Sequence, residues 1–161
     1  MKLTKYEHAC FTVEKGGQVL VIDPGNFTTD FIAPEHVVAV VITHQHADHF
    51  DLERLAQIFD KNDDVLVLGP ADVIDKVEIE NKQAVNPGEK VAVGPFDLEF
   101  FGGIHELIHS SYPRVQNIGV LINELVYYPG DSYALPDKPV DTLAVPTSAP
   151  WLKLGDAADF A

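Results

Sequence analysis

The sequence has a single cysteine, Cys10, among its 161 residues. One cysteine cannot form an internal disulfide, which is typical of proteins in a reducing compartment. Cys10 precedes Phe11 in an expected strand, so we expect a buried, inert thiol rather than a nucleophile. No apolar run approaches the roughly 20 residues that cross a bilayer, and the first residues lack the apolar core of a signal peptide. These absences predict a cytoplasmic protein that does not enter a membrane.

Positive charge is also scarce in this chain. Lysine and arginine total 11 against 25 aspartate and glutamate residues, which gives a formal net charge of −14. Binding to a phosphate backbone needs clustered positive charge, and the sequence contains no basic block. The composition therefore argues against a nucleic-acid partner and favours a small-molecule substrate.

The length and the hydrophobic pattern predict one α/β domain over residues 1–161. A helix over 52–59, capped by Asp51, has apolar residues at i, i+3, i+4 and i+7, and a brief helix is expected over 71–77. Gly16-Gly17 and Gly94-Pro95 are expected hairpin turns. The expected strands cover residues 2–7, 11–14, 18–22, 37–43, 65–68, 90–93, 96–101, 118–122, 125–128 and 142–145. Hairpins followed by alternating strands and helices predict mixed sheets with helices outside.

The most informative segment is Thr-His-Gln-His-Ala-Asp-His at residues 43–49, directly after the apolar run at 37–42. In an extended chain, side chains at i and i+2 share a face, so His44 and His46 would point the same way. Asp48 follows on a loop that can fold back over the same point. Neutral imidazoles suit Zn²⁺ and Fe²⁺, and a carboxylate adds a hard anionic ligand. The segment therefore predicts a metal site.

The spacing His-x-His-x-Asp-His after a strand resembles the signature of the metallo-β-lactamase superfamily of hydrolases. Residues 19–25 resemble the strand of that family that ends in an Asp-Pro-Gly turn, and residues 125–132 resemble the strand that delivers a metal-bridging aspartate. Residues 47–51 and 109–111 are similar to the branch that includes ascorbate-6-phosphate lactonase-like proteins. The resemblance covers most of residues 1–151 and implies an αββα sandwich.

The resemblance also implies a chemistry. Two metal ions would lie roughly 3.5–4 Å apart, bridged by a water or hydroxide. His44, His46 and a later histidine would hold the first ion, while Asp48, His49 and Asp131 would hold the second, with Asp131 shared. Zn²⁺ is the expected metal, as one or two ions, and Fe²⁺ or Mn²⁺ also suits these ligands. A metal-bound hydroxide would attack a small ester, lactone or phosphoester, and Asp48 would orient it or carry a proton.

The later histidine is open between two residues. His109 is favoured because the His-Ser-Ser sequence that it begins resembles a ligand position in the lactonase-like branch. His105, directly after Gly102-Gly103 and Ile104, is the alternative. Asp23 is expected to support a ligand by hydrogen bonding, and His8 is expected to be a surface or packed histidine.

The pattern also departs from the family. The superfamily usually supplies a further ligand histidine after the position of Asp131, whereas the last histidine here is His109. We therefore expect a C-terminally incomplete version of the fold, a weaker second metal site, and a sheet face that a homo-oligomer could cover. A non-catalytic metal-binding protein is the alternative function. A redox di-iron role is disfavoured because Gln45 stands where such proteins have a carboxylate.

Overall fold

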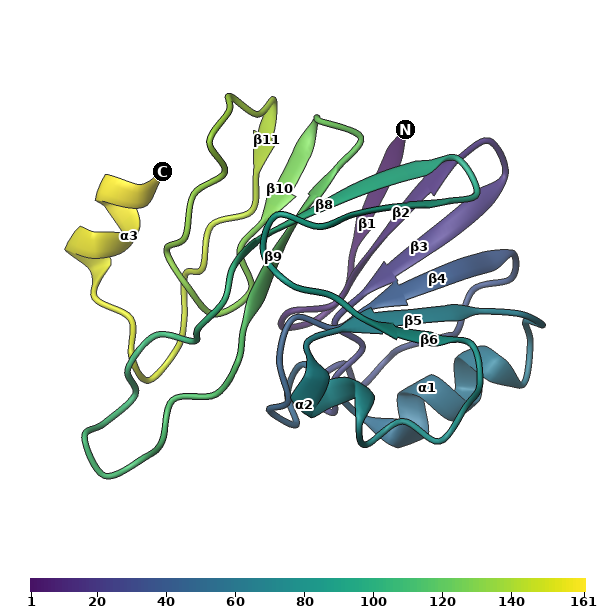
Figure 1. Ribbon diagram of the computed structural model, residues 1–161, viewed down its shortest axis with the longest axis horizontal. Coiled ribbons are helices and arrows are strands. Elements are labelled where there is room, and N and C mark those ends of the chain that lie inside the picture. Colours follow the sequence, from purple (N-terminus) through teal and green to yellow (C-terminus); the bar gives the residue numbers. More distant parts are fainter.

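Two mixed β-sheets pack face to face in the computed structural model, which describes residues 1–161 (Figure 1). The first sheet has the order β1 (Lys2–Lys5), β2 (Phe11–Lys15), β3 (Gln18–Ile22), β4 (Val37–Val41), β5 (Leu66–Gly69) and β6 (Lys82–Ala84). Its first three strands pair antiparallel, and β3 to β6 run parallel. The second sheet has the order β11 (Thr142–Leu143), β10 (Val126–Tyr128), β9 (Ile118–Ile122), β8 (Phe96–Gly102) and β7 (Lys90–Val93).

The main core lies between the two sheets because alternate side chains of each strand point inward. Leu20 and Ile22 of β3 face the second sheet, while Val21 between them faces the helices. From the second sheet, Phe100 and Val120 meet them, and all of these side chains are fully buried. The strands of the first sheet are thus packed on both faces, against the second sheet on one side and against the helices on the other.

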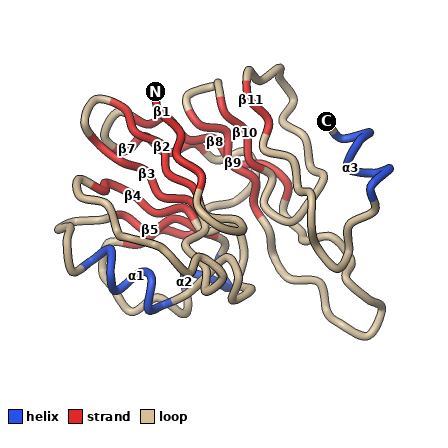
Figure 2. Tube along the Cα trace, turned by 180° about the vertical axis from the view of Figure 1, so that it is seen from behind, coloured by secondary structure: helices blue, strands red, loops and turns tan.

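Helices lie on the outer sides of both sheets, with α3 separated from most of the second sheet by loops (Figure 2). On the first sheet, α1 (Leu52–Phe59) and α2 (Ala71–Ile74) contribute to a second core of 15 buried residues. On the opposite side, Phe160 of α3 (Leu154–Phe160) packs with Leu121 and Tyr127 of the second sheet. The arrangement confirms the predicted α/β class and the αββα layering. None of the three helices has the length and apolar character needed to traverse a bilayer.

Most predicted elements form, and the differences have local causes. Asp51 caps α1 as expected by accepting the backbone N–H of Glu53 at 3.0 Å. The strand expected over 37–43 ends at Val41, and the Thr43 N–H donates to the Asp23 carboxylate at 2.7 Å instead of a neighbouring strand. Strand β6 was not predicted because its sequence, Lys-Gln-Ala, is polar and lies at a sheet edge.

Candidate metal centre

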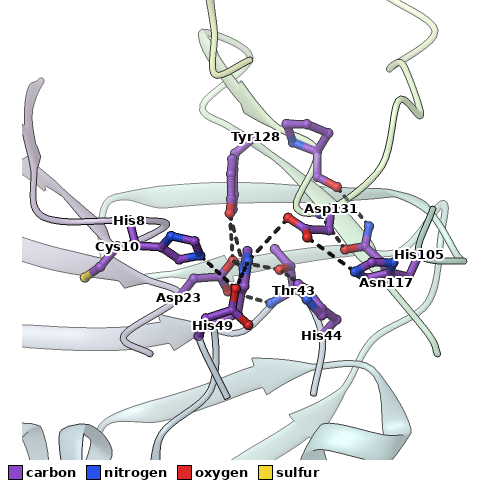
Figure 3. A network of polar contacts seen from close by, with 12 residues as sticks. His8, Cys10, Asp23, Thr43, His44, His49, His105, Asn117, Tyr128 and Asp131 are labelled. Carbon is purple, nitrogen blue, oxygen red and sulfur yellow. Dashed lines mark hydrogen bonds and ion pairs between the residues drawn. The ribbon is translucent and has the colours of Figure 1, made fainter. Parts of the chain in front are cut away.

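The predicted site lies where several strands end (Figure 3). Asp23 follows β3, His44 follows β4, His105 comes after β8, and Asp131 comes after β10. Open α/β sheets gather ligand sites at the carboxyl ends of their strands, and here ends from both sheets converge. The topology therefore brings together side chains that are up to 108 positions apart, from Asp23 to Asp131.

Four histidine rings form the centre of the cluster. The His44 ring centroid lies 4.8 Å from those of His46 and His105 and 4.1 Å from that of His49. His44, His49 and His105 are buried, and His46 is half-buried. Burial, reinforced by the neighbouring His49, holds the pKa of His44 well below its usual range, and burial with the neighbouring His105 lowers the pKa of His46. These two imidazoles are therefore neutral and can donate a lone pair.

Two of these rings carry a buried nitrogen without a hydrogen bond of good geometry: Nε2 of His44, and Nε2 of His105, which lies 3.3 Å from Oδ2 of Asp131. The other nitrogen of each ring is engaged. Nδ1 of His44 lies 3.0 Å from Oγ1 of Thr43, whose proton goes to Asp23, so Nδ1 must donate. Nδ1 of His105 lies 2.6 Å from the carbonyl oxygen of Glu106, which can only accept. Both Nε2 atoms therefore present lone pairs, and a buried acceptor left unpaired costs about 1–3 kcal/mol.

Asp23 organises one side of the cluster from a fully buried position. Its carboxylate accepts hydrogen bonds from N and Oγ1 of Thr43, both at 2.7 Å, and from the Tyr128 hydroxyl at 2.9 Å. It also lies 2.7 Å from Nδ1 of His49, which leaves Nε2 of that ring facing Asp131 at 3.3 Å. Burial alone would lower the pKa of His49, but Asp23 and Asp131 outweigh it and raise this pKa to about 10. Asp23 thus sits behind His49, as expected of a supporting residue.

Asp131 is held by hydrogen bonds from two directions, and Nε2 of His105 lies 3.3 Å from its Oδ2. Its backbone N–H donates to the side-chain oxygen of Asn117 at 2.9 Å, and the Trp151 indole N–H donates to its Oδ2, also at 2.9 Å. Burial alone would raise the pKa of the Asp131 carboxyl, but the adjacent His105 and His49 hold it well below its ordinary value. The carboxylate is therefore ionised and fixed, which suits it to share two ions.

Two glycines allow the backbone to approach the cluster. Gly130 has φ +65°, and an added Cβ would lie 2.5 Å from Oδ1 of Asn117 and 2.8 Å from Cβ of Thr43. At Gly25 the added atom would lie 1.9 Å from the carbonyl oxygen of Asp48. The Asp-Pro-Gly turn therefore packs directly against the histidine-rich loop.

The structure places the alternative, His105, and not the favoured His109, beside the other histidines. His109 is exposed, and its Nδ1 lies 2.8 Å from the Ser111 hydroxyl, while His105 lies among the other histidines. The backbone explains the difference, because His105 N–H donates to the Val115 carbonyl oxygen at 3.0 Å and Arg114 Nε donates to the His105 carbonyl oxygen at 2.7 Å. Backbone hydrogen bonds continue past the end of β8 at Gly102 as far as His105, and the loop beyond carries His109 away.

Three groups of side chains place metal-binding atoms within 4.8 Å of one another: His44, His46 and His105; His44, His49 and Asp131; and His8, Asp48 and His49. With the unpaired Nε2 of His44, imidazole nitrogens and carboxylate oxygens at this spacing fit a divalent transition metal. Every predicted site residue except His109 belongs to one of these groups, and His8 joins them unexpectedly.

Sequence reasoning missed the supporting roles of Asn117, Tyr128 and Trp151. Tyr128 and Trp151 carry no local signal, since aromatic residues in or near strands are most simply core residues. Asn117 directly precedes β9 and donates its amide to the Pro129 carbonyl oxygen at 2.9 Å, which fixes the turn before Asp131. Only the tertiary structure reveals these contacts.

Comparison with known proteins places the chain in a family. Residues 2–161 match the family described as Beta-lactamase superfamily domain. Protein Rv0786c of Mycobacterium tuberculosis is 32% identical over 165 residues, which cover 99% of this chain and 77% of that protein. A UPF0173 metal-dependent hydrolase of Shouchella clausii is 25% identical over 178 residues, covering 97% of this chain and 74% of the relative.

Solved structures agree on the fold. A candidate metal-dependent hydrolase from Parabacteroides distasonis superposes with a TM-score of 0.82 at 18% identity, over 98% of this chain and 75% of that chain. CmlA, a diiron β-hydroxylase from Streptomyces venezuelae, superposes with a TM-score of 0.70 at 21% identity, over 89% of this chain and 34% of that chain. The resemblance to the lactonase-like branch stays a prediction. By sequence and by fold, the chain belongs to the β-lactamase superfamily domain family.

Proposed function

We propose that this protein is a metal-dependent hydrolase that acts on a small ester, lactone or phosphoester. The observation that carries the proposal is the cluster of His44, His46, His49, His105 and Asp131, in which the buried Nε2 of His44 has no hydrogen-bond partner and the lone pair on Nε2 of His105 faces the Asp131 carboxylate at 3.3 Å. A purely structural cluster would pair the His44 nitrogen internally, since buried polar groups are normally satisfied. The family match and the name of the Shouchella clausii relative point to the same reaction class.

In this proposal His44, His46 and His105 hold one ion, Asp48 and His49 hold another, and Asp131 is shared. Bound metal would polarise the substrate oxygen and lower the pKa of a water molecule toward 7. The hydrogen bonds at Nδ1 of His44 and His105 keep the lone pairs of both rings directed inward.

Asp48 is the candidate catalytic residue because its carboxylate lies at the solvent-facing side of the cluster. Its side chain is 30% exposed, and Oδ2 lies 3.7 Å from Nε2 of His49. From this position the carboxylate can orient a reacting water or carry a proton to the leaving group, a role that contributes about 10²–10⁴-fold.

Two hollows open beside the cluster, and His8 and Asp131 line both of them. One of the two hollows is lined mostly by apolar and hydroxyl-bearing residues, and Lys5 is its one cation besides the histidines. The Lys5 ammonium is already bonded to backbone carbonyl oxygens, including that of Tyr6 at 2.5 Å and that of Cys10 at 3.3 Å. Apart from the proposed ions themselves, this lining offers no free cation to pair with phosphate, which favours a neutral ester or lactone.

The test is a hydrolysis screen over esters, lactones and phosphoesters with metal-reconstituted protein. We expect turnover by the wild type, a loss of about 10²–10⁴-fold in Asp48→Asn, and unchanged turnover in Asp97→Asn, which alters an exposed aspartate of β8. Full activity in Asp48→Asn would contradict the proposed role. Metal binding without turnover across the panel would favour the non-catalytic alternative.

Zn²⁺ is the proposed metal, with Fe²⁺ and Mn²⁺ compatible with the same ligands. The side chain of Gln45 contacts the Lys76 ammonium, so it does not supply a ligand of the di-iron type. The cytoplasmic location, the absence of a nucleic-acid partner and a homo-oligomeric state stay predictions.

A further inference from the structure

His8 is a histidine that the proposed ligand set does not use. It lies on the loop between β1 and β2, far in sequence from the histidine-rich loop, yet its ring points toward the cluster (Figure 3). Its Nε2 lies 2.8 Å from Oδ2 of Asp48. Its ring meets that of His49 edge to face, with centroids 5.5 Å apart, and packs in the same way on Phe27 at 5.1 Å. The ring is therefore positioned by contacts on two sides.

The loop that carries His8 is itself held in place. The Lys5 ammonium contacts the carbonyl oxygen of His8, and the Cys10 N–H donates to the carbonyl oxygen of Glu7 at 3.3 Å. The Glu7 carboxylate accepts the backbone N–H of Thr29 at 2.7 Å, which ties this loop to the segment after the Asp-Pro-Gly turn. A ligand on this loop needs little reorganisation to bind.

We propose that His8 is a further ligand of the metal ion held by Asp48 and His49. This inference rests on the proposed metal site. The binding atoms of His8, Asp48 and His49 lie within 4.8 Å of one another, which is the spacing of the His44 groups. His8 would add a second imidazole to the Asp48, His49 and shared Asp131 ligands, and imidazole nitrogen suits the same transition metals.

The competing explanation is a half-exposed ion pair between His8 and Asp48, with no role in metal binding. Both side chains are 30% exposed, and a pair of this kind contributes only about 0–1 kcal/mol. The two explanations make opposite predictions for metal affinity, because an ion pair with His8 would compete with the metal for Asp48. Removing it would then leave affinity unchanged or increase it.

The matched control is His36. His8 and His36 are both exposed histidines with left-handed backbone, at φ 51° and φ 62°, and asparagine tolerates this conformation at each position. His8→Asn and His36→Asn therefore remove an imidazole at equal backbone strain, one beside the cluster and one remote from it. Thermal denaturation in chelator checks that both variants fold, with midpoints expected near that of the wild type.

The experiment titrates chelator-treated wild type, His8→Asn and His36→Asn with Zn²⁺ by calorimetry and with Co²⁺ by visible absorption. We expect two metal equivalents in the wild type and in His36→Asn. In His8→Asn we expect one equivalent to bind at least about tenfold more weakly, with a changed Co²⁺ band, while the other is retained. If His8→Asn bound both metal equivalents as tightly as the wild type, the role of His8 would be overturned and the metal site itself would stand. A wild type that binds no metal would overturn both.

Discussion

Asp23 offers the sharpest test of how the cluster is held, and the change to make is Asp23→Asn. The substitution keeps the shape of the side chain but replaces one acceptor oxygen by a donor. Oδ1 accepts from Thr43 N, while Oδ2 accepts from the Thr43 hydroxyl and the Tyr128 hydroxyl and lies next to His49. In either orientation of the asparagine amide, its NH₂ group therefore points at a buried hydrogen-bond donor. The variant should therefore lose hydrogen bonds that no rearrangement of this side chain restores.

The magnitude follows from these contacts. Losing one hydrogen bond to a charged acceptor costs about 1.5–3 kcal/mol, and leaving its donor buried and unpaired costs about 1–3 kcal/mol more. We expect Asp23→Asn to lower the free energy of unfolding by about 2.5–6 kcal/mol in total. At about 2–4 °C per kcal/mol for a domain of this size, the midpoint should fall by about 5–24 °C.

The assay is thermal denaturation of chelator-treated wild type, Asp23→Asn and the exposed control Asp97→Asn. We expect the control to lie within about 0.5 kcal/mol of the wild type. In a parallel metal titration, Asp23→Asn should bind about 10–100-fold more weakly, because it no longer orients His49. If Asp23→Asn were as stable as Asp97→Asn, the inference that the buried hydrogen bonds of Asp23 hold the cluster together would be refuted.

Three further predictions use other parts of the cluster. Gly25→Ala places a Cβ 1.9 Å from a backbone carbonyl oxygen of the histidine-rich loop, so the free energy of unfolding measured by urea denaturation should fall by more than about 1–3 kcal/mol. Gly155→Ala adds a Cβ in open space in α3, so it should leave this free energy unchanged or raise it. The pKa of His49 is raised to about 10 in the folded, metal-free protein, so protonation of His49 stabilises the folded state. This stabilisation is complete below the unfolded pKa of about 6.5 and is lost as the pH rises toward 10. Urea denaturation in chelator should therefore show the free energy of unfolding falling by up to about 1.4 kcal/mol per pH unit between pH 7 and 8.5, and a flat profile would contradict this role of His49. His105→Asn should weaken metal binding in a calorimetric titration while His109→Asn leaves it unchanged, and the reverse result would restore His109 as the ligand.

Much of the fold follows from local patterns. The Gly16-Gly17 turn joins β2 and β3 with Lys15 opposite Gln18, and both glycines adopt the positive φ that such a two-residue turn requires. Alternating apolar residues mark the strands between the sheets, and Asp51 marks the start of α1. Strand β6 escapes this reasoning because its pairing with β5 depends on the neighbour and not on its own polar sequence.

The site divides in the same way. The residues from His44 to His49 all follow the end of one strand, so their spacing in the sequence predicts that they lie close together. The choice between His105 and His109 depends on where the chain leaves the sheet, which is set by backbone hydrogen bonds to residues of the returning loop. His8 and Trp151 reach the cluster from opposite ends of the chain, and no local pattern signals such contacts.

The two-metal centre is tested by the transition-metal content of the protein, measured by elemental analysis after purification without chelators and without a metal-binding tag. We expect about two ions per chain, held by the groups around His44 and Asp131. A metal content near zero, persisting after reconstitution with Zn²⁺, Fe²⁺ and Mn²⁺, would contradict it.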